Sequence, residues 1–97
     1  MPTEIKQIRD EKARRTVLRV SGEMFRDDAV LLARIAHEVG RDTSDAVTLD
    51  LADLDLLDSD AAHVLRQLSQ ERGFTIEGID TLLQNAIDEA ERHAASN

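Results

Sequence analysis

Cysteine, tyrosine and tryptophan are absent from this 97-residue sequence, and Phe25 and Phe74 are its two aromatic residues. Without cysteine the chain can form no disulfide, thiolate nucleophile or cysteine-bound metal site, and a reducing cytoplasm suits it. So few aromatic side chains argue against base-stacking platforms and aromatic-walled ligand pockets. The composition therefore disfavours thiol chemistry and gives no sign of a cofactor pocket.

Long apolar runs and an excess of positive charge are also missing. No apolar run approaches the roughly 18 residues that a membrane-spanning helix needs, so we expect no membrane insertion. Residues 1–10 lack the apolar stretch of a secretory signal, and we expect a cytoplasmic protein. The formal net charge of −8 opposes a phosphate backbone, which makes nucleic acid an unfavourable partner.

The acidic residues are unevenly distributed. Residues 1–26 hold seven bases and four acids, whereas residues 27–97 hold five bases and sixteen acids. The densest acidic stretch, residues 42–65, has seven aspartates and no lysine or arginine. Such a stretch would steer a basic protein surface towards it, although a solvated acidic surface that only keeps the protein in solution is the simpler interpretation. A hydrophobic fraction of 41% suits one compact domain, expected over residues 1–97.

Hydrophobic periodicity changes along the chain in a regular order. β-branched and alternating stretches predict strands, whereas apolar residues three or four apart predict helices. The predicted strands carry Ile5 and Ile8, residues 16–20, Val47, Leu49 and Leu51 with Thr48 and Asp50 between them, and Phe74 and Ile76. The predicted helices carry Leu31, Leu32, Ile35, Ala36 and Val39, then Ala61, Val64, Leu65 and Leu68, then Leu83, Ala86, Ile87 and Ala90. The order is therefore β-β-α-β-α-β-α.

The boundaries of these elements follow from capping residues and glycines. The expected caps are Asp27 or Asp28, Asp58, and Asp80 or Thr81, and the expected helix stops are Gly40, before a loop at residues 41–45, and Gly73. A turn is expected after Leu51, and Leu54, Leu56 and Leu57 are expected to continue the chain into the core before Asp58. The first two strands form a hairpin across a charged turn, and Gly22 relieves a tight bend where the second strand ends.

Alternating strands and helices predict an α/β fold, a mixed β-sheet with helices packed on it. The later strands are parallel with right-handed crossovers, and the first strand is added antiparallel at one side. Binding sites in such folds gather where strands end and helices begin. The turn that leads to Asp58, Ser59 and Asp60 is such a position. These three short side chains can accept hydrogen bonds from unpaired amides as simple caps, or the same amides can stabilise a phosphoryl group on serine.

The residues on either side of this turn resemble a known family. The segment Val20-Ser21-Gly22-Glu23-Met24 and the longer segment from Val47 to Ala61, VTLDLADLDLLDSDA, are similar to the glycine element and the phosphorylation-site loop of STAS domains, the bacterial anti-sigma-factor antagonists. The resemblance covers about residues 16–94. It implies a non-enzymatic regulatory protein that binds an anti-sigma factor, usually a serine kinase, until it is phosphorylated at the start of the second helix.

One departure from the family pattern affects the expected control. The family reads Asp-Ser-Ser/Thr-Gly with the third residue as phosphoacceptor, whereas this chain has Asp60 there and Ala61 in place of the glycine. Asp60 carries a permanent charge that partly imitates phosphate. We therefore expect no switching at Asp60, with Ser59 a poor substitute or control located elsewhere. The expected contact site is Asp58, Ser59 and Asp60, with Asp53, Asp55 and His63 at its rim.

Several alternatives compete with partner switching. A scaffold STAS subunit of a sensory or envelope transport complex fits the same resemblance, and a homodimer is left open. An acyl-carrier protein modified at Ser59 is less favoured, because that family is all-helical. Catalysis by Ser59 and His63, four apart on a helix, lacks an oxyanion hole and an orienting group, so His63 is better interpreted as loosely paired with Asp60. The aspartates lack the glycine and glutamate of a calcium loop, and the single histidines form no metal pair.

Overall fold

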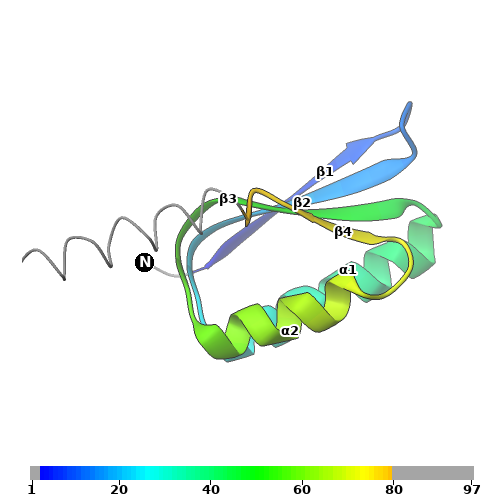
Figure 1. Cartoon of the computed structure of the whole chain (residues 1–97). Coiled ribbons are helices and arrows are strands. Elements are labelled where there is room, and N and C mark those ends of the chain that lie inside the picture. The colour runs from blue at the N-terminus through cyan, green and yellow to red at the C-terminus, as the bar shows by residue number, and fades with distance from the viewer. Residues whose placement is uncertain (1–2, 80–97) are drawn as a thin grey trace, which may run out of the picture.

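A computed structural model of the chain describes residues 3–79 and shows a mixed α/β arrangement (Figure 1). The elements are β1 (Glu4–Asp10), β2 (Arg15–Met24), α1 (Arg26–Thr43), β3 (Ala46–Leu57), α2 (Ser59–Ser69) and β4 (Phe74–Glu77). This order confirms the predicted β-β-α-β-α-β succession. The predicted third helix, with its caps at Asp80 or Thr81, lies outside the described residues.

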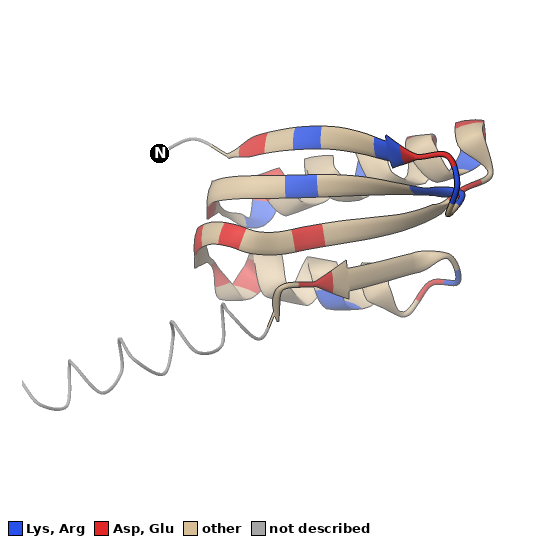
Figure 2. Ribbon diagram, turned by 90° about the horizontal axis from the view of Figure 1, so that it is seen from above, with Lys and Arg blue, Asp and Glu red and all other residues tan. Residues whose placement is uncertain are grey.

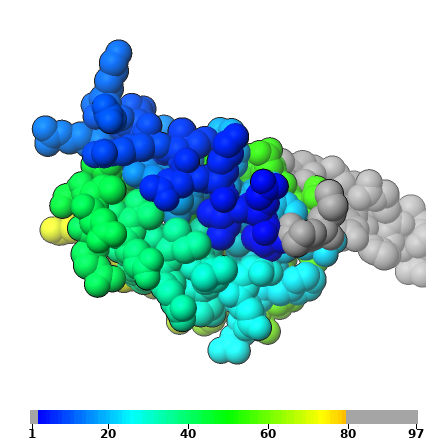
Figure 3. Space-filling view, turned by 180° about the vertical axis from the view of Figure 1, so that it is seen from behind, coloured from blue at the N-terminus to red at the C-terminus, as the bar shows by residue number. Residues whose placement is uncertain are grey.

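The four strands form one sheet in the order β1-β2-β3-β4. β1 pairs antiparallel with β2 through the expected hairpin, whereas β2, β3 and β4 are parallel. Both crossovers lead to the next strand along, and α1 and α2 lie on the same face of the sheet, as two crossovers of the same hand require (Figure 1). The rear view shows β1 above α1 (Figure 3). Such a sheet rules out the all-helical acyl-carrier alternative.

The core lies between the sheet and the two helices. It is made of side chains from β2, β3 and both helices, each at most 2% exposed: Leu18, Val20, Met24, Val47, Leu49, Leu51, Leu54, Ala29, Leu32, Ala36, Ala61, Leu65 and Leu68. The small residues Ala29, Ala36 and Ala61 let the helices approach the sheet closely. Thr48 is also buried, contrary to the simple alternation, because it lies in a central strand between Val17 and Thr75.

The ends of α1 differ from those predicted. Phe25, not an aspartate, is the N-cap residue, and Asp28 accepts a hydrogen bond from the Phe25 amide at 3.0 Å. The helix continues through Gly40 to Thr43 and ends at Ser44, which has a left-handed backbone (φ 58°) and donates its amide to the Gly40 carbonyl. A serine in this conformation provides the stop that glycine was expected to supply, because its amide satisfies one of the last carbonyls.

The end of α2 and the length of β3 also differ from expectation. α2 ends at Ser69, and Gly73 (φ 94°) lies in the turn that precedes β4 instead of ending the helix. β3 has no turn after Leu51, but continues as a strand to Leu57. Leu56 is 40% exposed and does not enter the core.

Two β-bulges explain the long third strand. Between the pairs Arg19↔Asp50 and Ser21↔Asp53, and again between Gly22↔Leu54 and Glu23↔Leu56, β3 uses one more residue than β2. Bulges bend a strand and increase its twist, and both strands curve down towards the helices here (Figure 1). Gly22, at the second bulge, has the positive φ of 92° that suits glycine, so the expected bend lies inside β2.

Candidate partner-binding site

The segment Asp58-Ser59-Asp60 lies where the bent end of β3 meets α2. Asp58 is the N-cap residue, with an extended backbone (φ −65°, ψ 150°), and Ser59 is the first helical residue. The Asp58 amide donates a hydrogen bond to the Met24 carbonyl at the end of β2, 3.0 Å away. Because α1 begins at Arg26, this bond holds the entrances of both helices at the same edge of the sheet.

The polar side chains of this segment do not cap the helix. Ser59 and Asp60 are exposed and Asp58 is half-buried, but Asp58 makes no side-chain capping bond. Its carbonyl instead accepts the Ala62 amide at 2.8 Å and closes the first turn of the helix. The prediction of capping by the Asp58 side chain is therefore wrong. Within residues 3–79 neither Asp58 nor Asp60 forms an ion pair. No described lysine, arginine or histidine therefore competes with a partner protein for these two carboxylates.

Asp53 and Asp55 lie on the bulged end of β3, close to this segment in the chain. Both are exposed, whereas Leu54 between them is 2% exposed and belongs to the core. Neither carboxylate forms an ion pair with another residue in the described part of the chain. The structure thus brings two of the three predicted rim residues to the same end of the sheet as the start of α2.

His63 occupies a different environment from the one expected. It is exposed on the second turn of α2, and its Nε2 lies 3.4 Å from Nε2 of Gln67, so the predicted pairing with Asp60 is wrong. No hydrogen bond joins Ser59 to His63 among residues 3–79. The other described histidine, His37, contacts the Glu71 carboxylate at 3.0 Å. Across the same residues, no three His, Asp or Glu side chains are placed to hold a metal ion.

Sequence reasoning missed two apolar residues beside this site. Phe25, at the entrance of α1, is 49% exposed, and Leu56, next to the segment on β3, is 40% exposed. Their backbones are close because Met24 pairs with Leu57 in the β2–β3 register. A strict two-residue alternation starting from Leu54 would have placed Leu56 in the core, and the second bulge breaks that alternation. No sequence signal marked Phe25.

Acidic residues dominate this end of the molecule, which we call the acidic end and define as residues 23–28 and 53–60. It contains the acids Glu23, Asp27, Asp28, Asp53, Asp55, Asp58 and Asp60 and one base, Arg26. Figure 2 shows red segments gathered where the strands end and the helices begin. The positive ends of two helix dipoles point to the same place and favour this negative charge. The acidic end therefore combines charge with the exposed Phe25 and Leu56.

Asp50 supports the first bulge from within the sheet. Its Oδ1 accepts the Ala52 amide at 3.1 Å, and its Oδ2 lies 3.4 Å from Nε of Arg19. Ala52 and the residues after it are thereby directed towards the acidic end. The carboxylate of Asp50 is therefore one reason why β3 bends before it reaches Asp58.

Replacing Asp50 with alanine is expected to lower the free energy of unfolding by about 1–2 kcal/mol, because the Ala52 amide loses its acceptor. The pair with Arg19 contributes little, since both side chains are partly exposed. Asp50→Asn keeps an oxygen for the amide and is expected to cost less than about 1 kcal/mol. Urea unfolding at low protein concentration measures both. An equal loss of unfolding free energy in the two variants would show that the hydrogen bond from the Ala52 amide does not account for the destabilisation.

None of the helices in the described part of the chain is long and apolar enough to cross a membrane.

Comparison with known proteins identifies the family of the chain. No curated protein sequence matches the chain significantly. A crystal structure of an anti-sigma-factor antagonist STAS domain from Rhodobacter sphaeroides is similar, with a TM-score of 0.61 and 16% identity over 81% of this chain and 89% of that chain. The sequence model that describes the STAS domain family matches residues 4–94 of the chain. The chain therefore belongs to the STAS domain family.

Proposed function

We propose that this chain is a non-enzymatic regulatory module that recognises another protein through its acidic end. The observation that carries the proposal is that Asp58 and Asp60 stand at a helix entrance with no ion-pair partner among residues 3–79. Carboxylates placed in this way attract a basic partner surface from solution and fix its orientation. Phe25 and Leu56 add apolar area at the same end, so the partner surface is expected to be basic around an apolar centre.

The resemblance to anti-sigma-factor antagonists supports one class of partner. We propose an anti-sigma factor or a serine kinase that acts as one, bound in the cytoplasm. Asp60 takes the place of the family's phosphoacceptor, and its permanent charge stands exposed in the first turn of α2. One carboxylate has less charge and fewer acceptor oxygens than a phosphoryl group, so it imitates the phosphorylated state in part. Binding by this chain is then set by partner concentration and not by phosphorylation of residue 60.

Reversing the charge at the helix entrance tests the proposal. The double variant Asp58→Lys/Asp60→Lys is expected to weaken partner binding about 100-fold, because like charges then face each other across the contact. The tagged full chain, added to an extract of its native cell, serves as bait, and the captured proteins are identified and quantified by mass spectrometry. The expected capture is a sigma-factor regulator or serine kinase, lost from the variant.

A matched control carries the same change of charge elsewhere. Glu38 and Asp42 are exposed near the end of α1 that is remote from the acidic end, and Glu38→Lys/Asp42→Lys should capture the partner as the unmodified chain does. Equal loss in both variants would show that net charge alone governs capture. Recovery of a sensory or envelope transport complex would instead support the scaffold function.

A further inference from the structure

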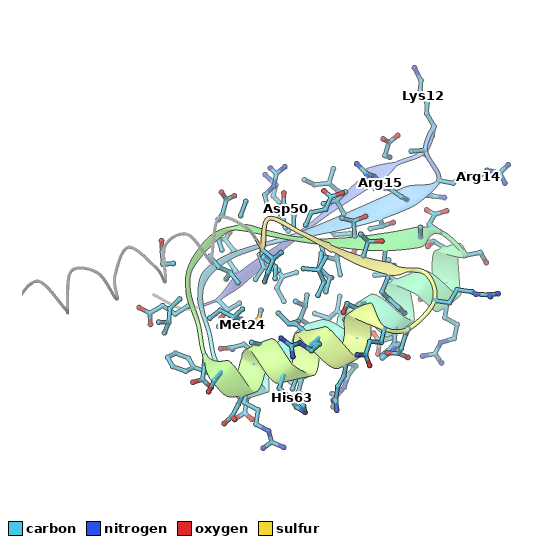
Figure 4. The ribbon with its side chains drawn as sticks, viewed as in Figure 1. Lys12, Arg14, Arg15, Met24, Asp50 and His63 are labelled. Carbon is cyan, nitrogen blue, oxygen red and sulfur yellow. The ribbon has the colours of Figure 1, made fainter. Side chains whose placement is uncertain are left out.

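The sheet face opposite α1 and α2 carries a regular row of charges. In the strand register Lys6 pairs with Arg19, Arg19 with Asp50, and Asp50 with Glu77, so one residue from each strand lies in the same row. Figure 2 shows this row as two blue bands followed by two red bands across the four strands. Asp50 and Arg15 lie on the side of the sheet away from the helices (Figure 4). No element among residues 3–79 covers this face, which we call the open face.

Three members of the charged row form long, partly exposed ion pairs within the chain, and the fourth, Lys6, forms none with the described residues. Arg19 Nε lies 3.4 Å from the Asp50 carboxylate, with the two side chains 47% and 23% exposed. Arg15 Nη1 reaches to 3.7 Å from Glu77, whose side chain is 53% exposed. Lys6 is exposed and forms no ion pair with any other described residue. The outer members, Lys6 on β1 and Glu77 on β4, are thus a free cation and a loosely held anion at opposite sides of the open face.

The neighbouring row of the open face is uncharged. The register places Ile8 beside Val17, Val17 beside Thr48, and Thr48 beside Thr75. Ile8 is 36% exposed, although it is a large apolar residue. A surface that fits this face must therefore offer β-branched or apolar groups along one row and charges in the order minus, minus, plus, plus along the next.

We propose that the open face binds the open face of a second copy of this chain. The two open faces pack against each other, and the two-fold axis lies between them, parallel to the strands. In this arrangement β1 of one copy lies over β4 of the other, and β2 lies over β3. Lys6 then faces Glu77 of the partner subunit and Arg19 faces the partner's Asp50, while Ile8 faces the partner's Thr75. Each contact occurs twice, as an isologous interface requires.

Charge order selects this geometry over the alternatives. An axis across the strands would place β1 on β1 and bring like charges together, which is costly in an interface. A uniformly basic or acidic partner would meet repulsion from half of the row. A second copy satisfies all four positions because the row is its own complement.

The size of the open face sets the strength of the dimer. Four strands spaced about 4.8 Å apart give a contact about 20 Å wide. The surface area that such a contact buries is at the low end of the range for protein interfaces. The dimer should therefore be weak and sensitive to salt, since its outer ion pairs are exposed at the rim. The acidic end is left free, and the axis parallel to the strands places both acidic ends at the same end of the dimer.

Two single charge reversals test the interface. In Lys6→Glu the new carboxylate faces the partner's Glu77, and in Glu77→Lys the new ammonium faces the partner's Lys6. Each variant alone is expected to raise the dimer dissociation constant at least about tenfold, whereas an equimolar mixture should recover the affinity of the unmodified chain within about threefold. Sedimentation velocity of the full chain up to about 1 mM measures the constants.

Matched controls carry the same charge changes outside the open face. Lys12→Glu in the β1–β2 turn, where Lys12 projects away from the sheet (Figure 4), and Glu38→Lys on α1 should leave dimerisation unchanged. The proposal is overturned if the unmodified chain is monomeric over this range, if either single variant dimerises as well as it does, or if the mixture is no better than its components. A monomer whose open face is covered by residues 80–97 would give the first of these results.

Discussion

Replacing Gly78 with alanine is expected to lower the free energy of unfolding by about 3 kcal/mol or more and the Tm by about 15 °C. Gly78 follows β4 with a positive φ of 82°, a conformation that alanine adopts only with strain. A Cβ at this position would lie 2.5 Å from the Ala52 nitrogen and 2.9 Å from its Cα. Both are backbone atoms of the bulged strand, so the clash is relieved only by moving β3 or the end of β4.

Gly73 provides the matched control for this prediction. It has a similar φ of 94°, but a Cβ there would meet no atom within 4 Å. Gly73→Ala should therefore cost only the conformational strain, about 1–2 kcal/mol. Thermal and urea unfolding followed by circular dichroism compare the two variants. If both lose the same stability, the close approach of Gly78 to Ala52 has no energetic effect and the prediction fails.

Replacing Asp60 with serine is expected to convert a chain that takes no phosphate at residue 60 into one that is phosphorylated there stoichiometrically. The change restores the family's Asp-Ser-Ser pattern, and the hydroxyl would occupy an exposed position in the first turn of α2. The amides and dipole of the helix entrance would stabilise the phosphoryl group. Incubation with ATP in an extract of the native cell, followed by intact-mass measurement, detects the gain of one phosphoryl group.

Ser59 must be removed to assign the modified position. In the Asp60→Ser/Ser59→Ala variant the phosphoryl group should remain, and in the unmodified chain none should appear on either residue. Stoichiometric phosphate on Ser59 of the unmodified chain would overturn the proposal that this site is not switched. Phosphorylation of Asp60→Ser with no change in partner capture would contradict the proposal that Asp60 imitates phosphate.

Periodicity was sufficient to predict the element order and most of the core. Strands and helices that bury one face leave a direct pattern in the sequence, and Leu18, Leu49 and Leu65 all lie in the core. The candidate site was located because its position depends on topology: a loop between a parallel strand and a helix lies at the carboxyl edge of the sheet. The exposure of Ser59 and Asp60 at the start of α2 agrees with that prediction.

Local competition between backbone and side-chain hydrogen bonds could not be predicted in the same way. Whether Asp27, Asp28 or Phe25 begins α1 depends on which carboxylate reaches which amide, and Asp28 reaches back to Phe25. The exposure of Leu56 depends on bulges that arise from the pairing of β3 with β2, two strands separated by all of α1. A residue pattern within one strand contains no information about the length of its neighbour.

The mixed sheet also affects the order in which the protein folds. β1 and β2 pair across a short turn and can associate within microseconds, as isolated hairpins do. Every other strand pair is parallel and must wait for a helix to cross over, so closure of these distant contacts should limit the folding rate. Until β3 arrives, the hairpin exposes the apolar side chains of Leu18 and Val20 together with an unsatisfied strand edge. Chains at high concentration, or newly synthesised up to about residue 45, are therefore the ones most prone to aggregate through β2.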